Sequence, residues 1–164
     1  MSSRKWKTLE VERHFVIQAP VDATVLPYQD GVLLTIVVSE DPRTEVLADV
    51  FDVSAEDVAI GPAFLKASLT YFVTTSIASA IKRPVDEYDI QERSENGRWS
   101  YQALVPLEMN SAEPDESRFW LARTEWIEGQ GRFFLIHWNG PMRFLRKPVL
   151  RIFESFTPMS ISTE

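Results

Sequence analysis

The sequence has no cysteine among its 164 residues, which excludes disulfide bonds and thiolate metal sites. It has only two histidines and no His-Glu-x-x-His spacing, so an imidazole metal site is not expected. Glycine occurs 6 times, and no glycine-rich loop of the phosphate-binding kind is present. No serine lies in a Gly-x-Ser-x-Gly turn. We therefore predict no metal, no cofactor and no enzymatic activity.

Positive charge is also in short supply. The chain has 17 Lys and Arg against 24 Asp and Glu, a formal net charge of −7. Binding to a phosphate backbone needs a clustered positive field, so we expect no nucleic-acid partner. No apolar window approaches the ~18 residues of a membrane span, and the N-terminus lacks the apolar region of a secretory signal. We expect a cytoplasmic protein with no membrane span.

The composition is that of a protein with a filled core. Ten Phe, 5 Trp and 4 Tyr, with 45% hydrophobic residues, argue against disorder. The length fits one domain. We predict a flexible tail over residues 1–8, a single domain over 9–157 and a second tail over 158–164.

Strands and one long helix are predicted along the chain. Strands are expected at 11–19, 31–39, 87–93, 99–108, 118–127 and 132–138. A helix is expected from Pro62 to about Lys82, because apolar residues recur there at spacings of three and four. Residues 40–60 are rich in Asp and Glu and are predicted to form solvated turns or a short helix.

The most informative segment runs from Gly131 to Phe156. Residues 133–138 form an almost continuous apolar strand, which indicates a strand covered on both faces. Asn139-Gly140-Pro141 is expected to end that strand. A helical face follows, with apolar side chains at Leu145, Val149, Ile152, Phe153 and Phe156. The predicted fold class is α+β, a mostly antiparallel sheet of about six strands packed with the long central helix and a short C-terminal helix.

Three short motifs resemble those of the family that includes the photosystem subunit PsbP, a nuclear Ran-binding factor and the bacterial DcrB-type proteins. They are Gly131-Arg132-Phe133-Phe134, the helix ending Glu154-Ser155-Phe156, and the opening strand 14–17 before Pro20. The family's Pro-x-x-Trp after the first strand is absent. The resemblance implies a PsbP-like sandwich and adaptor or chaperone work, since some DcrB-type relatives are chaperones for secreted effectors.

His137 lies on the apolar strand, where it shares a face with Phe133 and Leu135, and it could act as a general base near neutral pH. The alternative is a partly buried histidine that is hydrogen-bonded to a backbone group or a carboxylate. We favour that alternative, because a general base also needs a positioned partner. His14 is interpreted in the same way.

A local excess of positive charge surrounds the turn into the last helix. Arg143, Arg146 and Lys147 could bind an anionic partner through charge-assisted hydrogen bonds. The alternative, which we favour, is that they pair with the chain's own acidic loops. Trp120 and Trp126 share a strand face and could line a binding groove, although a place in the core is the more common use of tryptophan.

Taken together, these features predict a non-catalytic protein that binds a protein or peptide partner, with homodimerisation as a further possibility. The alternative is a small-molecule carrier, or a cofactor-independent enzyme, with a cavity between the long helix and the sheet. An apolar pocket that holds His137 and a carboxylate would favour the alternative. An exposed apolar groove would favour the binding protein.

Overall fold

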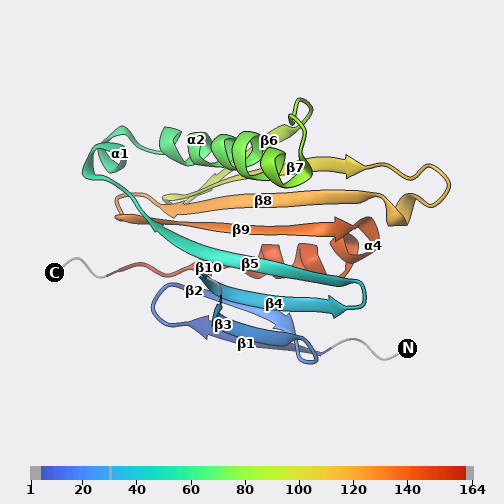
Figure 1. The fold of residues 1–164 in the computed structure, drawn as a ribbon. Helices are drawn as coiled ribbons and strands as arrows, with labels where there is room; N and C mark the ends of the chain where they lie inside the picture. Colours follow the sequence, from blue (N-terminus) through green and yellow to red (C-terminus); the bar gives the residue numbers. More distant parts are fainter. Residues whose placement is uncertain (1–4, 30, 162–164) are drawn as a thin grey trace.

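The structure is a computed structural model that describes residues 5–29 and 31–161. A seven-stranded antiparallel sheet lies at its centre (Figure 1), with a smaller three-stranded sheet beside it. The large sheet has the order β3 (Thr24–Gln29), β4 (Val32–Glu40), β5 (Arg43–Asp52), β9 (Arg132–Pro141), β8 (Arg118–Ile127), β7 (Arg98–Glu108), β6 (Asp89–Glu95). The small sheet consists of β1 (Trp6–Val11), β2 (Phe15–Pro20) and β10 (Thr157–Pro158).

Helices cover the two faces of the large sheet (Figure 1). One face carries α1 (Ala55–Ile60) and a long helix made of α2 (Ala63–Tyr71), a π-helical stretch (Phe72–Ile77) and α3 (Ala78–Ile81). The other face carries α4 (Met142–Phe144), a second π-helical stretch (Leu145–Val149) and α5 (Leu150–Ser155). A 3-10 turn (Pro114–Glu116) lies in the loop between β7 and β8.

The long helix forms where the apolar periodicity predicts it. Leu65, Leu69, Val73 and Ile77 recur at intervals of four and are all fully buried against the sheet. The helix widens to π geometry where Val73, Thr74 and Thr75 follow one another, because β-branched side chains crowd the preceding turn of an α-helix.

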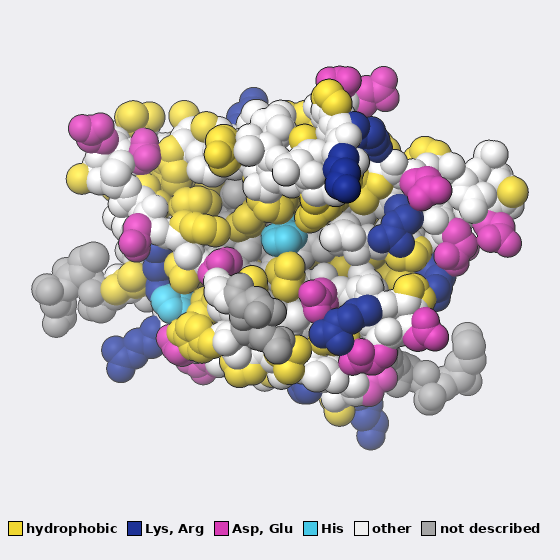
Figure 2. Space-filling view, viewed as in Figure 1, with side chains coloured by type: hydrophobic (Ala, Val, Ile, Leu, Met, Phe, Trp, Pro, Cys, Tyr) yellow, Lys and Arg dark blue, Asp and Glu magenta, His cyan; other side chains and the backbone are white. Residues whose placement is uncertain are grey.

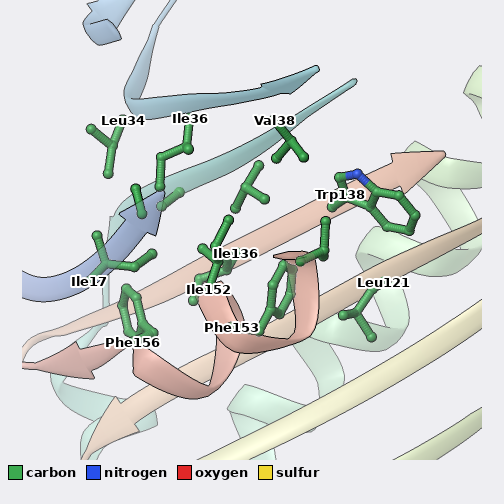
Figure 3. Close-up of a cluster of buried hydrophobic side chains, with 14 of the residues drawn as sticks. Ile17, Leu34, Ile36, Val38, Leu121, Ile136, Trp138, Ile152, Phe153 and Phe156 are labelled. Carbon is green, nitrogen blue, oxygen red and sulfur yellow. The ribbon is translucent and has the colours of Figure 1, made fainter. Parts of the chain in front are cut away.

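The C-terminal helix closes a second core on the opposite face (Figure 3). All five residues of the predicted helical face are buried, and Phe153 and Phe156 have no exposed surface, as the sequence predicts. They pack with Ile17 of β2 and with Ile136 and Trp138 of β9. The helix is interrupted at Lys147, which has extended backbone angles (φ −149°, ψ 119°).

A buried charge network fixes the end of α5 to the sheet. Arg123, only 4% exposed, donates to the Phe153 carbonyl at 2.9 Å and to the Glu154 carboxylate at 3.2 Å. Arg98 donates to the Phe156 carbonyl and to Glu125, which is 1% exposed. Burial raises the pKa of the Glu125 carboxyl, and the guanidinium groups of Arg98 and Arg123 oppose that rise. The last carbonyls of the helix are thus satisfied by cations, the favourable sign at a helix C-terminus.

The motif Glu154-Ser155-Phe156 has a physical role at each position. Glu154 accepts hydrogen bonds from Arg123 and Arg93. The Ser155 hydroxyl donates to the Ile152 carbonyl and accepts from the backbone N–H of Gln18 in β2. The Phe156 ring is packed against Phe15 with 4.7 Å between ring centroids. The motif therefore joins the last helix to both sheets.

Several predictions about the strands were wrong. The described residues contain ten strands rather than about six, and residues 6–8 belong to β1 instead of a tail. Residues 43–52, predicted as solvated turns or a short helix, form strand β5, in which the buried Thr44, Val46 and Ala48 alternate with more exposed side chains, two of them acidic. Strand β9 includes Asn139 and Gly140 and ends at Pro141, three residues after the expected end at residue 138.

Both predicted tails extend beyond the described residues. Residues 1–4 and 162–164 lie outside them. Within the described part, Pro158 pairs with Phe15, and the Met159 N–H donates to the His14 carbonyl at 2.8 Å. The chain after residue 157 is therefore tied to β2 at its first positions.

The segment Ala63–Ile81 also bears on the membrane prediction. With 19 residues and a mean hydropathy of 1.2, it is long and apolar enough to cross a membrane by length and composition. The statement that no window approaches that length was wrong. In the structure 22% of this window is buried, and one side of the helix packs on β7 and β8.

Replacing Phe153 by alanine should lower the free energy of unfolding by about 3–5 kcal/mol, because the ring is fully buried and would leave a cavity. Leu150→Ala, on the same helix but 38% exposed, should cost much less. Denaturant unfolding of the two variants measures both values. Equal losses would contradict the packing described for α5.

Candidate functional site

An apolar groove runs along the inner edge of the long helix, where the helix stops covering the sheet (Figure 2). Its volume is about 640 Å³ and it is open to solvent on one side. Helix α2 and the π-helical stretch form one wall, and β5 and β9 form the floor. The apolar residues that line it are Phe51, Phe64, Ala67, Tyr71, Phe72, Phe133 and Leu135. Two of them are strongly exposed, Phe51 at 41% and Tyr71 at 67%.

Strand register gives the floor its shape. In the antiparallel pair β5–β9, Leu47 lies opposite His137, Asp49 opposite Leu135 and Phe51 opposite Phe133. These six side chains point toward the helix side of the sheet, because alternate residues of a strand share a face. Aromatic contacts extend the floor to the wall: Phe133 stacks on Phe51 at 5.3 Å between centroids and meets Phe64 edge-on at 5.8 Å.

His137 lies beyond Phe72, at one end of this floor. The Trp120 indole N–H donates to His137 Nδ1 at 3.2 Å, and the Phe72 ring lies 4.9 Å from the imidazole. Because an indole can only donate, Nδ1 accepts, and the neutral ring carries its proton on Nε2. The expected backbone or carboxylate partner is therefore replaced by Trp120. No hydroxyl or carboxylate within the described residues is hydrogen-bonded to His137.

The surroundings of His137 oppose its protonation. Burial among aromatic side chains lowers the pKa of His137 from its usual 6.5 to about 4. The ring is therefore neutral at pH 7 and acts as a hydrogen-bond donor through Nε2. In that state it can orient a polar group but carries no charge.

The two tryptophans of the predicted site, Trp120 and Trp126, differ in their burial and contacts. Trp126 is fully buried, packs against Phe64 at 4.9 Å, and donates its N–H to the Gln130 carbonyl. The structure therefore places it in the core, where it cannot contact a partner. Trp120 is partly buried and supports His137 rather than lining the groove.

The three basic residues of the predicted site lie on the opposite face, near the loop before β8. All three are exposed, as expected. Arg143 pairs with Glu116 at 2.8 Å and Arg146 pairs with Asp115 at 2.7 Å, while Lys147 has no ion pair among residues 5–29 and 31–161. The two arginines thus pair with an acidic loop of the chain itself, the alternative that the sequence analysis favoured.

A second depression lies between β6–β7 and the C-terminal helix. Its volume is about 680 Å³, and Leu104 and Leu150 line it together with the carboxylates of Asp86, Glu87 and Asp89. Its lining is more polar than that of the groove beside α2. Across the described ranges, no group of three His, Asp or Glu side chains is arranged to hold a metal ion.

Sequence reasoning missed the residues that form the groove. Phe51 follows an acidic segment that was predicted to be solvated. Tyr71 lies outside the apolar stripe by which the long helix packs on the sheet. The one signal available was that Phe133 and Leu135 share a face with His137, since that face of β9 cannot be fully covered by one helix.

Comparison with known proteins defines the fold. No protein-family model matches the sequence, and no curated protein matches it. Among solved structures, cyanobacterial PsbP from Synechocystis superposes with a TM-score of 0.66 at 12% identity, over 96% of this chain and 94% of that one. The Ran-binding protein Mog1p from Saccharomyces cerevisiae gives 0.53 at 12% identity, over 94% and 96% of the two chains.

A third similar structure is LpqN, described as involved in cell envelope biogenesis of Mycobacterium tuberculosis. Its TM-score is 0.54 at 14% identity, with 97% of this chain and 93% of LpqN covered. The PsbP-like fold suggested by residues 131–156 is confirmed. At these identities the likeness concerns the fold alone.

Stability should depend on pH through His137. Because its pKa is about 4 in the folded protein and near 6.5 when unfolded, protonation favours unfolding. The free energy of unfolding should fall by up to ~3 kcal/mol as the pH drops from 6.5 to 4. His137→Gln, whose amide oxygen can still accept from Trp120, should flatten that dependence. Denaturant titrations at several pH values test this, and an unchanged slope in the variant would contradict it.

The ion pairs of Arg143 and Arg146 are open to a charge-swap test. Reversing both arginines to glutamate should cost about 1 kcal/mol of stability, because exposed pairs contribute little and like charges repel. Adding Asp115→Arg and Glu116→Arg should restore most of the loss. If the quadruple variant is no more stable than the double variant, these pairs do not act as described.

Proposed function

We propose that this chain is a non-catalytic binding protein that recognises a protein or peptide partner in the apolar groove between α2 and strands β5 and β9. The observation that carries the proposal is the apolar surface that Phe51 on the floor and Tyr71 on the wall of the groove leave exposed. Large aromatic side chains gathered at an open surface are typical of binding sites, where they supply contact area at small entropic cost.

The groove favours an elongated occupant. It is open along one side and its floor follows the strand direction through Leu135 and Phe133. A small-molecule site normally buries most of the surface of its ligand, which an open groove does less well. A helix or an extended segment could instead place several apolar side chains into the groove in succession.

The non-catalytic part of the proposal is supported by His137. Acid–base catalysis needs a positioned partner group, and the hydrogen bond to Nδ1 comes from an indole that cannot relay a proton. An adaptor or chaperone role is the more specific form of the proposal. It is supported by analogy with a Ran-binding protein of the same fold, and a cytoplasmic location belongs to the same proposal.

A photo-cross-linking amino acid at position 71 tests the proposal in the producing cells. Tyr71 lies on the groove wall, whereas Tyr28, 63% exposed on the edge strand β3, provides a matched control position. We expect a discrete protein adduct from position 71 and none from position 28. Equal adducts from both positions, or none from position 71, would contradict the proposal.

The exposed aromatic residues should contribute most of the binding. Phe51→Ser should reduce the adduct at position 71 several-fold, because the change removes apolar contact area from the groove floor. The melting temperature should change little, since the ring is 41% exposed. Met109→Ser, which removes an apolar side chain that is 67% exposed elsewhere, serves as the control and should leave the adduct unchanged.

A further inference from the structure

The charges at the groove are all of one sign. Asp57 of α1 is the only charged residue among those that line the groove in the described part of the chain. Asp49 lies opposite Leu135 on the floor, so its carboxylate stands beside an apolar lining residue. Both aspartates are partly buried.

Neither carboxylate has a cationic partner within the described residues. Asp49 accepts a hydrogen bond from the backbone N–H of Val50 at 2.9 Å, and no ion pair involves either Asp49 or Asp57. Elsewhere the chain pairs its buried carboxylates: Glu125 lies 2.7 Å from Arg98 and 3.7 Å from Arg123. The groove is thus a place where partly buried negative charge is left uncompensated.

This matters once an occupant covers the groove. A purely apolar occupant would take both carboxylates out of water without compensation, which is costly. An occupant with a lysine or arginine beside its apolar side chains would supply the missing cation. A second copy of this chain seated groove to groove would bring like charges together, and each copy carries a net charge of −7.

We infer that the groove takes an amphipathic segment of another protein that carries a lysine or arginine next to its apolar side chains. This inference rests on the proposed function and specifies the chemistry of the partner. The apolar side chains pack on Phe51, Phe133 and Tyr71, and the cation meets Asp49 and Asp57. Recognition should therefore weaken with ionic strength, as expected for partly exposed charge pairs.

Two synthetic amphipathic peptides test the inference. They share the same leucine positions, and their polar positions are all lysine in one and all glutamate in the other. Fluorescence anisotropy measures the affinity of each for the full chain at low and high salt. We expect the lysine peptide to bind at least tenfold more tightly at low salt, with the difference shrinking at high salt.

Variants separate local recognition from attraction by the net charge. The double variant Asp49→Asn and Asp57→Asn should weaken binding of the lysine peptide about tenfold. The control pair Glu10→Gln and Glu108→Gln makes the same change in net charge at exposed positions on β1 and β7 and should have little effect. An equal loss in the control pair would overturn the inference, since binding would then reflect long-range attraction.

The remaining outcomes distinguish the inference from the proposed function. If both peptides bind equally and Phe51→Ser weakens both, the charge preference is wrong and the groove still binds peptides. If neither peptide binds, the inference is overturned, and the cross-linking at position 71 decides the proposed function separately. If sedimentation shows a dimer that Phe51→Ser dissociates, the occupant is a second copy and the inference is again overturned.

Discussion

The hydrogen bonds between Arg123 and the end of α5 are the interaction on which the rest of the structure depends. Arg123 comes from the middle of β8, yet it donates to the carbonyl of Phe153, thirty positions later in the chain. A buried guanidinium needs acceptors, and a helix C-terminus needs donors, so each group meets the requirement of the other. With α5 held in this way, Phe153 and Phe156 complete the core and the small sheet is joined through Ser155.

The groove exists because one face of the large sheet is less completely covered by other elements than the opposite face. Seven strands spaced by about 4.8 Å span roughly 30 Å, whereas one helix is about 10 Å wide. The side that carries α5 is also covered by β1 and β2, and the other side has the long helix over β7 and β8. The outer surface of β5 and β9 therefore keeps apolar residues in partial contact with solvent, and Phe51 stacks on Phe133 there.

The sequence predicts the elements that carry a clear period. The long helix begins and ends within a residue or two of its expected bounds, and the C-terminal helix buries the face that its spacing indicates. Strand β5 was missed because Glu45, Asp49 and Asp52 made the segment resemble a solvated acidic loop, which drew attention away from the alternation of Thr44, Val46 and Ala48. Strand β3 carries Pro27, which is tolerated because the strand lies at the edge of the sheet.

The groove was beyond sequence reasoning for a different reason. Its lining comes from β5, α1, α2, the π-helical stretch, β8 and β9, and only the register of β5 on β9 places Phe51 beside Phe133. Strand register and helix position are set by packing over the whole domain, so no local sequence motif indicates them. The ion pair of Arg123 and Glu125 is easier to predict from the sequence. Two charged residues inside the apolar strand FWLARTEWI indicate a buried ion pair.

The alternation of side chains along β5 and β9 divides these strands between two roles in the structure. Odd-numbered positions, such as 47, 49, 133 and 135, face the side of the sheet that carries the long helix, whereas even-numbered positions, such as 46, 48, 134 and 136, fill the core. Substitutions at one parity therefore alter the groove side of the sheet, whereas substitutions at the other parity alter the core. The same ten-residue strands thus build the core with one face and the groove floor with the other, in a fold that this chain shares with PsbP, Mog1p and LpqN at 12–14% identity.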